Sequence, residues 1–280
     1  MSIARTDPNN AFQPRALIVT VYGLYARDAT GWLSVSALIR LMAELGVDEA
    51  AVRSSISRLK RRGILQARAR DGAAGYALSG TARSLLDSGD RRIFERPRAA
   101  PGEAWLLAVF SVPESERSRR HALRSRLTWL GFGTVAAGVW IAPAHLEAET
   151  RDALERDDLT AYVDLFRADY LDFGKVGEQV RTWWDLTGLQ GLYDDFLSAY
   201  GPVLTRWRRR RATSGTSADA DAFADYVSTL TAWRRLPYLD PGLPDDVLPK
   251  GWSGARAADL FFDLRDRLAE PAAAFVTTVR

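Results

Sequence analysis

The sequence contains no cysteine and only two histidines, His121 and His145. Without cysteine the chain can form no disulfide, and it offers no thiolate nucleophile and no cysteine-ligated zinc or iron–sulfur site. Neither histidine has a second histidine at the spacing of metal ligands, and both fit surface positions better than catalytic ones. We therefore predict no metal, no cofactor and no catalytic residue.

Long apolar runs are also missing. No stretch approaches the ~20 apolar residues that a membrane helix needs. The first residues, MSIARTDPNNAFQPR, lack the apolar core of a secretory signal, so we expect a cytoplasmic protein in which residues 1–14 form a disordered arm. The sequence shows no Gly-rich phosphate loop, no Gly-x-Ser-x-Gly elbow and no credible catalytic triad.

Positive charge is concentrated in one part of the chain. The net charge is only +3, but residues 1–90 hold twelve basic and eight acidic side chains, a difference of +4, and the remainder sums to −1. Between Arg53 and Arg70 there are seven basic residues and no acidic one. A local excess of this kind on a neutral body is typical of a module that binds a polyanion.

The same region has the pattern of a helix-turn-helix. Apolar residues recur at helical spacing over residues 15–27. Ser34 is a candidate N-cap for a helix that stops at Gly46, and Asp48 is a candidate N-cap for a helix that stops at Gly63. Three helices with a tight, Gly-containing turn between the second and third match helix-turn-helix spacing.

The third helix separates into an apolar and a polar face. Val52, Ile56 and Leu59 fall on one side and should be buried. The DNA-contact candidates on or beside the opposite face are Arg53, Ser54, Ser57, Arg58 and Arg61. Small residues let a helix approach base edges closely, and arginine can hold guanine O6 and N7 together. The alternative interpretation is an ordinary solvated charged face.

A hairpin follows this helix. The pattern predicts strands at 64–70 and 76–79 around a turn at 71–75, with Arg68 and Arg70 on one strand face. A basic helix followed by a basic hairpin is what a winged helix-turn-helix presents to DNA. We predict that the helix enters the major groove and that Arg68 and Arg70 meet the backbone.

The chain as a whole predicts an α+β protein of several domains. We expect a winged helix-turn-helix at 15–90, a linker at 91–102, and a domain at 103–175 with the order β-α-β-β-α-β, which is that of the ferredoxin-like split βαβ. Residues 176–280 predict an all-helical C-terminal domain. Its helices should lie within 177–186, 190–211, 221–236 and 253–279, with a polar linker at 212–220.

Four stretches resemble the PaaX repressors of phenylacetic acid catabolism, across residues 15–270. They are RALIVTVYGLYAR, VRSSISRLKRRGIL, FSVPESERSRRHALRSRLTWLGFGTVAAGVWIAP and WRRLPYLDPGLPDDVLPKGWSGARAADLF. The resemblance implies an N-terminal winged helix, a central Cas2-like ferredoxin-type domain and a helical C-terminal domain. It further implies a homodimeric repressor that leaves its DNA operator when it binds an acyl-CoA, with phenylacetyl-CoA as the known type of effector.

An enzyme and a protein-interaction module are competing interpretations. The Cas2 likeness suggests a nuclease, but Cas2-type nucleases carry an Asp at the end of the first strand for a metal ion. Here that strand ends in VFSV, and no carboxylate follows until Glu114, which favours a scaffold or dimerisation unit. The enzyme class also includes a CoA-dependent catalyst built on the C-terminal domain. In the interaction module, the basic helix would bind an acidic protein.

Aromatic and basic residues cluster in the C-terminal third. Trp233, Arg234 and Arg235 are candidates for an aromatic acyl-CoA site, since an acyl ligand needs an apolar slot and its phosphates need arginine. Tryptophans at such positions are more often core residues. The run Arg206–Arg211 ends a predicted helix, where positive charge is favourable, and a phosphate contact is its alternative role.

Overall fold

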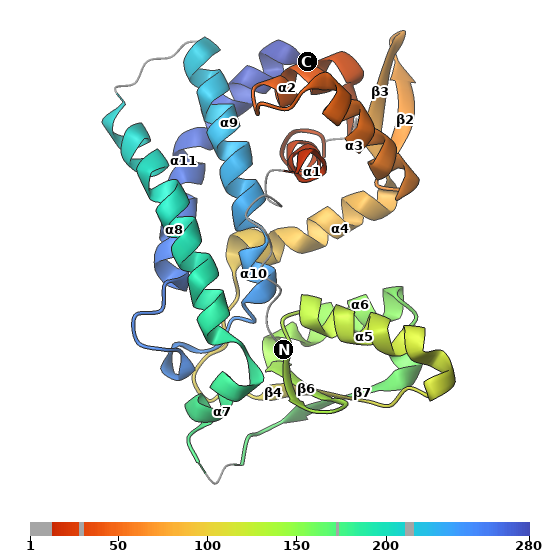
Figure 1. Cartoon of the computed structure of the whole chain (residues 1–280), viewed down its shortest axis with the longest axis vertical. Helices are drawn as coiled ribbons and strands as arrows, with labels where there is room; N and C mark the ends of the chain where they lie inside the picture. The colour runs from red at the N-terminus through yellow and green to blue at the C-terminus, as the bar shows by residue number, and fades with distance from the viewer. Residues whose placement is uncertain (1–12, 28–30, 172–173, 211–215) are drawn as a thin grey trace. The chain divides into compact units, whose positions relative to one another are not determined.

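The computed structural model describes residues 13–27, 31–171, 174–210 and 216–280 (Figure 1). Residue contacts divide it into two compact units, each assembled from segments that are distant in the sequence. The first unit holds Arg91–Tyr193 and Arg235–Ser253. The second holds the described residues up to Asp90, together with Asp194–Arg234 and Gly254–Arg280. The predicted arm lies outside the described residues, apart from its last two positions.

The N-terminal part of the second unit consists of helices around a small antiparallel sheet of order β1-β3-β2. Its elements are α1 (Pro14–Tyr25), β1 (Trp32–Ser34), α2 (Val35–Ala43), α3 (Glu49–Arg61), β2 (Leu65–Arg70), β3 (Ala73–Leu78) and α4 (Gly80–Asp90).

Both predicted N-caps of this region are confirmed. The Ser34 hydroxyl accepts a hydrogen bond from the Ala37 amide at 3.0 Å, and the Asp48 carboxylate accepts one from the Ala51 amide at 2.8 Å. Each bond satisfies a backbone donor that the first turn of a helix leaves unpaired. Gly63 follows α3 with a φ of +68°, a conformation that favours glycine. The ends of α2 and α3 are thus set by local chemistry.

Three local expectations need correction. The sequence pattern assigns no element to Trp32 and Leu33, but residues 32–34 form a strand because β3 offers them an antiparallel partner. The hairpin turn is shorter than predicted, since β2 and β3 pair as far as Arg70 and Ala73. The linker predicted at 91–102 begins with a π-helical turn over Arg91–Glu95, which continues α4 from Asp90.

Two C-terminal helices complete the core of the second unit. Helix α9 (Thr216–Trp233) packs against α1 and against α11 (Gly254–Val279), and α11 also contacts α2. The buried Thr231 hydroxyl donates to the Thr20 hydroxyl at 2.7 Å. Helix α8 (Leu186–Arg209) contributes its residues from Asp194 onward. Helix α9 begins within the stretch predicted as a polar linker.

The first unit contains the predicted β-α-β-β-α-β order, which is confirmed. Its antiparallel sheet has the order β5-β6-β4-β7, as in a split βαβ. The elements are β4 (Trp105–Phe110), α5 (Arg117–Trp129), β5 (Gly133–Ala136), β6 (Val139–Pro143), α6 (Glu147–Arg156) and β7 (Val163–Ala168). Leu106 and Trp140 face a core that includes Leu123 and Leu127 of α5 and Leu154 of α6.

The other face of this sheet is covered at one end. Trp105 and Ile141 pack with Val180 of α7 (Val176–Trp183), with Trp184, and with Val247 of a short 3-10 helix (Asp245–Val247). Tryptophan residues therefore fill core positions here, as expected for aromatic side chains at these spacings.

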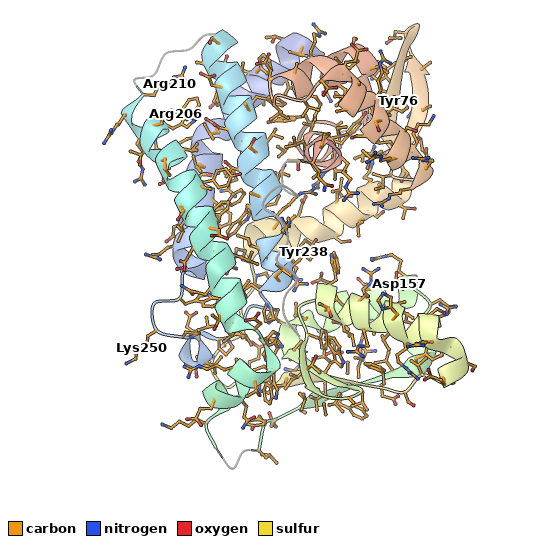
Figure 2. The ribbon with its side chains drawn as sticks, in the orientation of Figure 1. Tyr76, Asp157, Arg206, Arg210, Tyr238 and Lys250 are labelled. Carbon is orange, nitrogen blue, oxygen red and sulfur yellow. The ribbon has the colours of Figure 1, made fainter. Side chains whose placement is uncertain are left out.

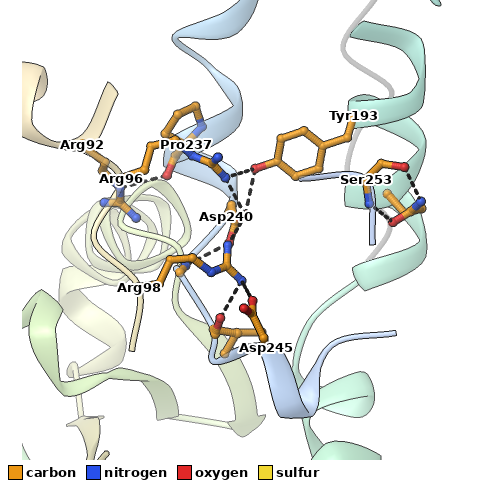
Figure 3. A network of polar contacts seen from close by, with 11 residues as sticks. Arg92, Arg96, Arg98, Tyr193, Pro237, Asp240, Asp245 and Ser253 are labelled. Carbon is orange, nitrogen blue, oxygen red and sulfur yellow. Dashed lines mark hydrogen bonds and ion pairs between the residues drawn. The ribbon is translucent and has the colours of Figure 1, made fainter. Parts of the chain in front are cut away.

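A polar network holds the segment that follows α4. The Asp240 carboxylate is 3% exposed; it lies 3.6 Å from Arg96 and 3.5 Å from Arg98, and it accepts a hydrogen bond from the Tyr193 hydroxyl at 2.8 Å (Figure 3). The Arg92 guanidinium donates to the Pro237 carbonyl at 3.0 Å. Because a buried charge is tolerated only when it is paired and hydrogen-bonded, this network fixes residues 92–98 to residues 237–240 within the first unit.

Candidate nucleic-acid interface

Helix α3 buries the face that the sequence predicted. Val52, Ile56 and Leu59 are at most 3% exposed. The opposite face reaches solvent, and the exposed residues include all five of its DNA-contact candidates: Arg53, Ser54, Ser57, Arg58 and Arg61. The burial of one stripe therefore aims small polar groups and guanidinium groups outward from the same helix.

One acidic side chain shares this surface. The Glu49 carboxylate lies one turn before Arg53 and pairs with its guanidinium at 2.6 Å. Both side chains are more than half exposed, so solvent screens the pair and it stabilises the helix little. Arg53 can therefore exchange this partner for another anion at small cost.

The hairpin presents its arginines on an exposed strand. Arg68 and Arg70 both lie on β2, which is exposed from Gln66 onward. Trp32 of β1 anchors this strand, because its indole Nε1 donates to the Arg68 carbonyl at 2.7 Å. Gly75 pairs with Arg68 across the hairpin and lies against the indole. The position of Arg68 is thus set by a contact with β1, the strand that the sequence did not reveal.

A hollow of about 240 Å3 lies between α3 and the hairpin. Its lining combines both elements with the start of α2: Val35, Arg53, Ile56, Ser57, Lys60, Arg61 and Tyr76. Lys60 Nζ lies 5.7 Å from the centre of the ring of Tyr76 (Figure 2). The structure therefore brings Arg53, Ser57 and Arg61 together around one hollow.

Sequence reasoning missed two polar residues of this hollow, Lys60 and Tyr76. The helical spacing puts Lys60 only at the edge of the exposed face, and the hairpin pattern identifies Tyr76 only as a strand residue. Lys60 could have been identified from its place in α3, because it lies one turn after Ile56 and next to the predicted contact residue Arg61. Nothing in the sequence marks Tyr76, because its approach to α3 depends on how the hairpin folds back.

The three effector candidates occupy different environments. Trp233 is fully buried; its ring stacks on Phe261 at 4.8 Å between ring centres and lies 5.4 Å from Phe196. Arg234 donates to the Ala16 carbonyl of α1 at 3.2 Å. Arg235 is partly buried, and this burial lowers the pKa of its guanidinium. Trp233 fits the core role, and an effector role for the three residues stays a prediction.

The basic run at the end of α8 is partnered by acidic side chains of other helices. Arg206 pairs with Asp225 and Arg210 with Asp221, both on α9, and Arg208 pairs with Asp263 of α11. Figure 2 labels Arg206 and Arg210. The Trp207 indole also donates to Asp225 at 2.6 Å. These arginines join helices of the second unit while their charge sits at a helix C-terminus, where it is favourable.

The nuclease interpretation requires carboxylates that can hold a metal ion near the end of the first strand of the Cas2-like domain. Strand β4 ends at Phe110, and the Glu114 carboxylate after it accepts a hydrogen bond from Arg120 at 2.7 Å. Within the described ranges, no three His, Asp or Glu side chains gather as a metal site. The same ranges contain no helix long and apolar enough to cross a membrane.

Comparison with known proteins covers nearly the whole chain. Three family models match: "PaaX-like protein" over residues 13–82, "PaaX protein central Cas2-like domain" over 98–180 and "PaaX-like protein C-terminal domain" over 184–278. "Transcriptional repressor PaaX" of Escherichia coli strain K12 is 25% identical over 265 residues, which span 94% of this chain and 82% of the relative. A solved structure of an uncharacterised protein from Mycobacterium tuberculosis matches with a TM-score of 0.57 at 25% identity, covering 94% of this chain and 99% of that one.

Proposed function

Because the chain belongs to the PaaX family, we propose that it is a transcriptional repressor that binds double-stranded operator DNA. A relative that covers 94% of the chain is named as a repressor. The observation that carries the proposal is the exposed basic face of α3 beside an equally exposed basic hairpin. Polyanion binding needs such a surface, and here two elements of one unit supply it.

The proposed contacts follow a winged helix-turn-helix. Helix α3 enters the major groove, where Arg53 and Ser54 approach base edges, while Ser57, Arg58 and Arg61 lie toward the phosphates that border the groove. Arg68 and Arg70 of β2 contact the phosphate backbone, which positions the protein without reading sequence. The Cas2-like domain acts as a scaffold in a homodimer, so that two α3 helices meet two half-sites.

We further propose that an aromatic acyl-CoA releases the protein from its operator, with phenylacetyl-CoA as the first compound to test. Release requires that the ligand bind the DNA-incompetent state more tightly than the competent state. A tenfold loss of DNA affinity corresponds to about 1.4 kcal/mol of coupling, within the usual range.

The packing of α1 supports a short route for that coupling. Helix α1 contacts both α3 and α9. The contact with α9 includes the buried bond between Thr20 and Thr231 and the bond from Arg234 to the Ala16 carbonyl. A ligand that shifts the end of α9 would therefore move α1, and with it the support of the recognition helix.

A mobility-shift assay with the DNA upstream of the protein's own gene tests the DNA proposal. We expect a retarded complex that Arg53→Ala weakens by ~1–3 kcal/mol, the usual cost of a lost arginine–guanine contact. Ser57→Glu should abolish specific binding, since it places a carboxylate against DNA. Ser84→Glu on the exposed face of α4 is the matched control. Wild-type affinity in the folded Arg53 and Ser57 variants would refute this interface.

The effector proposal has its own test. Free phenylacetate, coenzyme A and phenylacetyl-CoA are titrated separately, with DNA affinity and tryptophan fluorescence as readouts. We expect only phenylacetyl-CoA to lower DNA affinity tenfold or more. If none of the three changes either signal at millimolar concentration, the effector proposal fails and the DNA proposal stands.

A further inference from the structure

The hollow between α3 and the hairpin has the composition of an anion site. It combines the cationic groups of Arg53, Lys60 and Arg61 with the hydroxyl groups of Ser57 and Tyr76. Lys60 and Arg61 form no ion pair with any residue that the structure describes, and the Ser57 and Tyr76 hydroxyls donate no hydrogen bond there. These donors are therefore available to a ligand.

The hairpin beside the hollow is anchored to the rest of the unit. Tyr22 is fully buried in α1 and donates its hydroxyl to the Tyr76 carbonyl at 3.0 Å. Trp32 holds the neighbouring strand through the Arg68 carbonyl. Val35 and Ile56 add apolar surface to the lining. A site whose walls are held in this way loses little conformational freedom when a ligand enters.

On these observations we propose that the hollow is a phosphate-binding subsite, in which Lys60, Arg61 and the Ser57 and Tyr76 hydroxyls hold one phosphate of the DNA backbone. The inference rests on the proposed DNA-binding function and deepens it. The major and minor grooves are adjacent and separated by one sugar–phosphate strand. If α3 lies in the major groove and the hairpin follows the backbone, that strand passes between them and places a phosphate against the hollow.

The size and charge of the hollow agree with this occupant. Its volume of about 240 Å3 is roughly eight times the ~30 Å3 share of one liquid water, which leaves room for a phosphate and its ester oxygens. The lining contains no acidic side chain, and Glu49 of α3 is paired with Arg53. The remaining cations therefore meet the phosphate without an acidic competitor of their own.

The test measures affinity against salt concentration for two duplexes of equal length, one from the upstream DNA and one of unrelated sequence. For Lys60→Gln we expect a loss of about tenfold per protomer for both duplexes, as one charge-assisted hydrogen bond would give. The slope of log K against log salt should fall by about 0.9 for each lost phosphate contact, hence by about 1.8 for a homodimer that loses two. Tyr76→Phe keeps the ring beside Lys60 and should cost about threefold. Lys250→Gln, an exposed lysine in the other unit, is the charge-matched control and should change nothing.

Single methylphosphonate substitutions, which neutralise one backbone phosphate at a time, locate the contact in the upstream duplex. One position in each half-site should weaken the wild type and leave Lys60→Gln unaffected, because the variant has already lost that contact. An unchanged salt slope, or a loss confined to the upstream duplex, would overturn the proposal and make the occupant a base. If the wild type binds neither duplex, the proposed DNA-binding function fails, and this outcome is distinct from failure of the phosphate subsite alone.

Discussion

Replacing Gly75 with alanine should detach the hairpin from β1. A Cβ at this position would lie 2.4 Å from the Trp32 indole and 2.5 Å from the Leu33 carbonyl oxygen. Ordinary carbon contacts are ~3.5–4.0 Å, so β1 and β3 must separate by about 1 Å. The indole can rotate away, but the Leu33 carbonyl belongs to the paired strand and moves only with it.

The expected cost has two parts. Overpacking a filled site costs ~1–3 kcal/mol. Loss of the bond from Trp32 to the Arg68 carbonyl adds ~0.5–1.5 kcal/mol, so Gly75→Ala should lower the free energy of unfolding by about 2–4 kcal/mol. Because Arg68 lies directly opposite Gly75, affinity for DNA of unrelated sequence should fall as well.

Gly80→Ala is the matched control for this experiment. Gly80 is the first residue of α4, and nothing lies within 4 Å of the Cβ it would gain. Its replacement should be neutral or stabilising by ~0.4–1 kcal/mol, since it restricts the unfolded chain. Urea unfolding followed by circular dichroism gives the stability, and a mobility shift gives the DNA affinity. Equal stability of the two variants would refute the predicted clash of a Cβ at position 75 with the Trp32 indole and the Leu33 carbonyl oxygen.

Three further predictions concern other parts of the molecule. Asp240→Ala should destabilise the first unit by ~3–5 kcal/mol, because it removes the buried carboxylate that Arg96, Arg98 and the Tyr193 hydroxyl share; urea unfolding measures this, and a loss below 1 kcal/mol would contradict it. Burial lowers the pKa of His145, so the unfolded chain takes up its proton first and stability should fall as the pH drops below about 6.5. Unfolding midpoints between pH 7.5 and 5 should lose this dependence in His145→Gln and keep it in His121→Gln. Trp233→Ala should cost ~3–5 kcal/mol, as a truncated core aromatic does, and a near-neutral unfolding result would instead favour a ligand slot.

The contact network at α1 could not be read from periodicity. The spacing of Leu17, Ile18 and Val21 identifies a buried face, and these residues are buried, but spacing does not say what covers that face. In the structure it lies within a core that includes α9 and α11, more than 190 residues further along the chain. The division into three consecutive domains stays a prediction, while the compact units combine distant segments.

The sequence alone determined what depends on neighbours along the chain. The caps at Ser34 and Asp48, the buried stripe of α3 and its exposed arginines follow from hydrogen bonds and periodicity within a few residues. The β-α-β-β-α-β order followed from patterns of similar range. Tertiary structure decided the rest: strand β1, the approach of Tyr76 to Lys60, and the burial of Trp233 between Phe261 and Phe196. Each of these depends on a partner distant in sequence, and a partner of that kind is selected by packing in three dimensions.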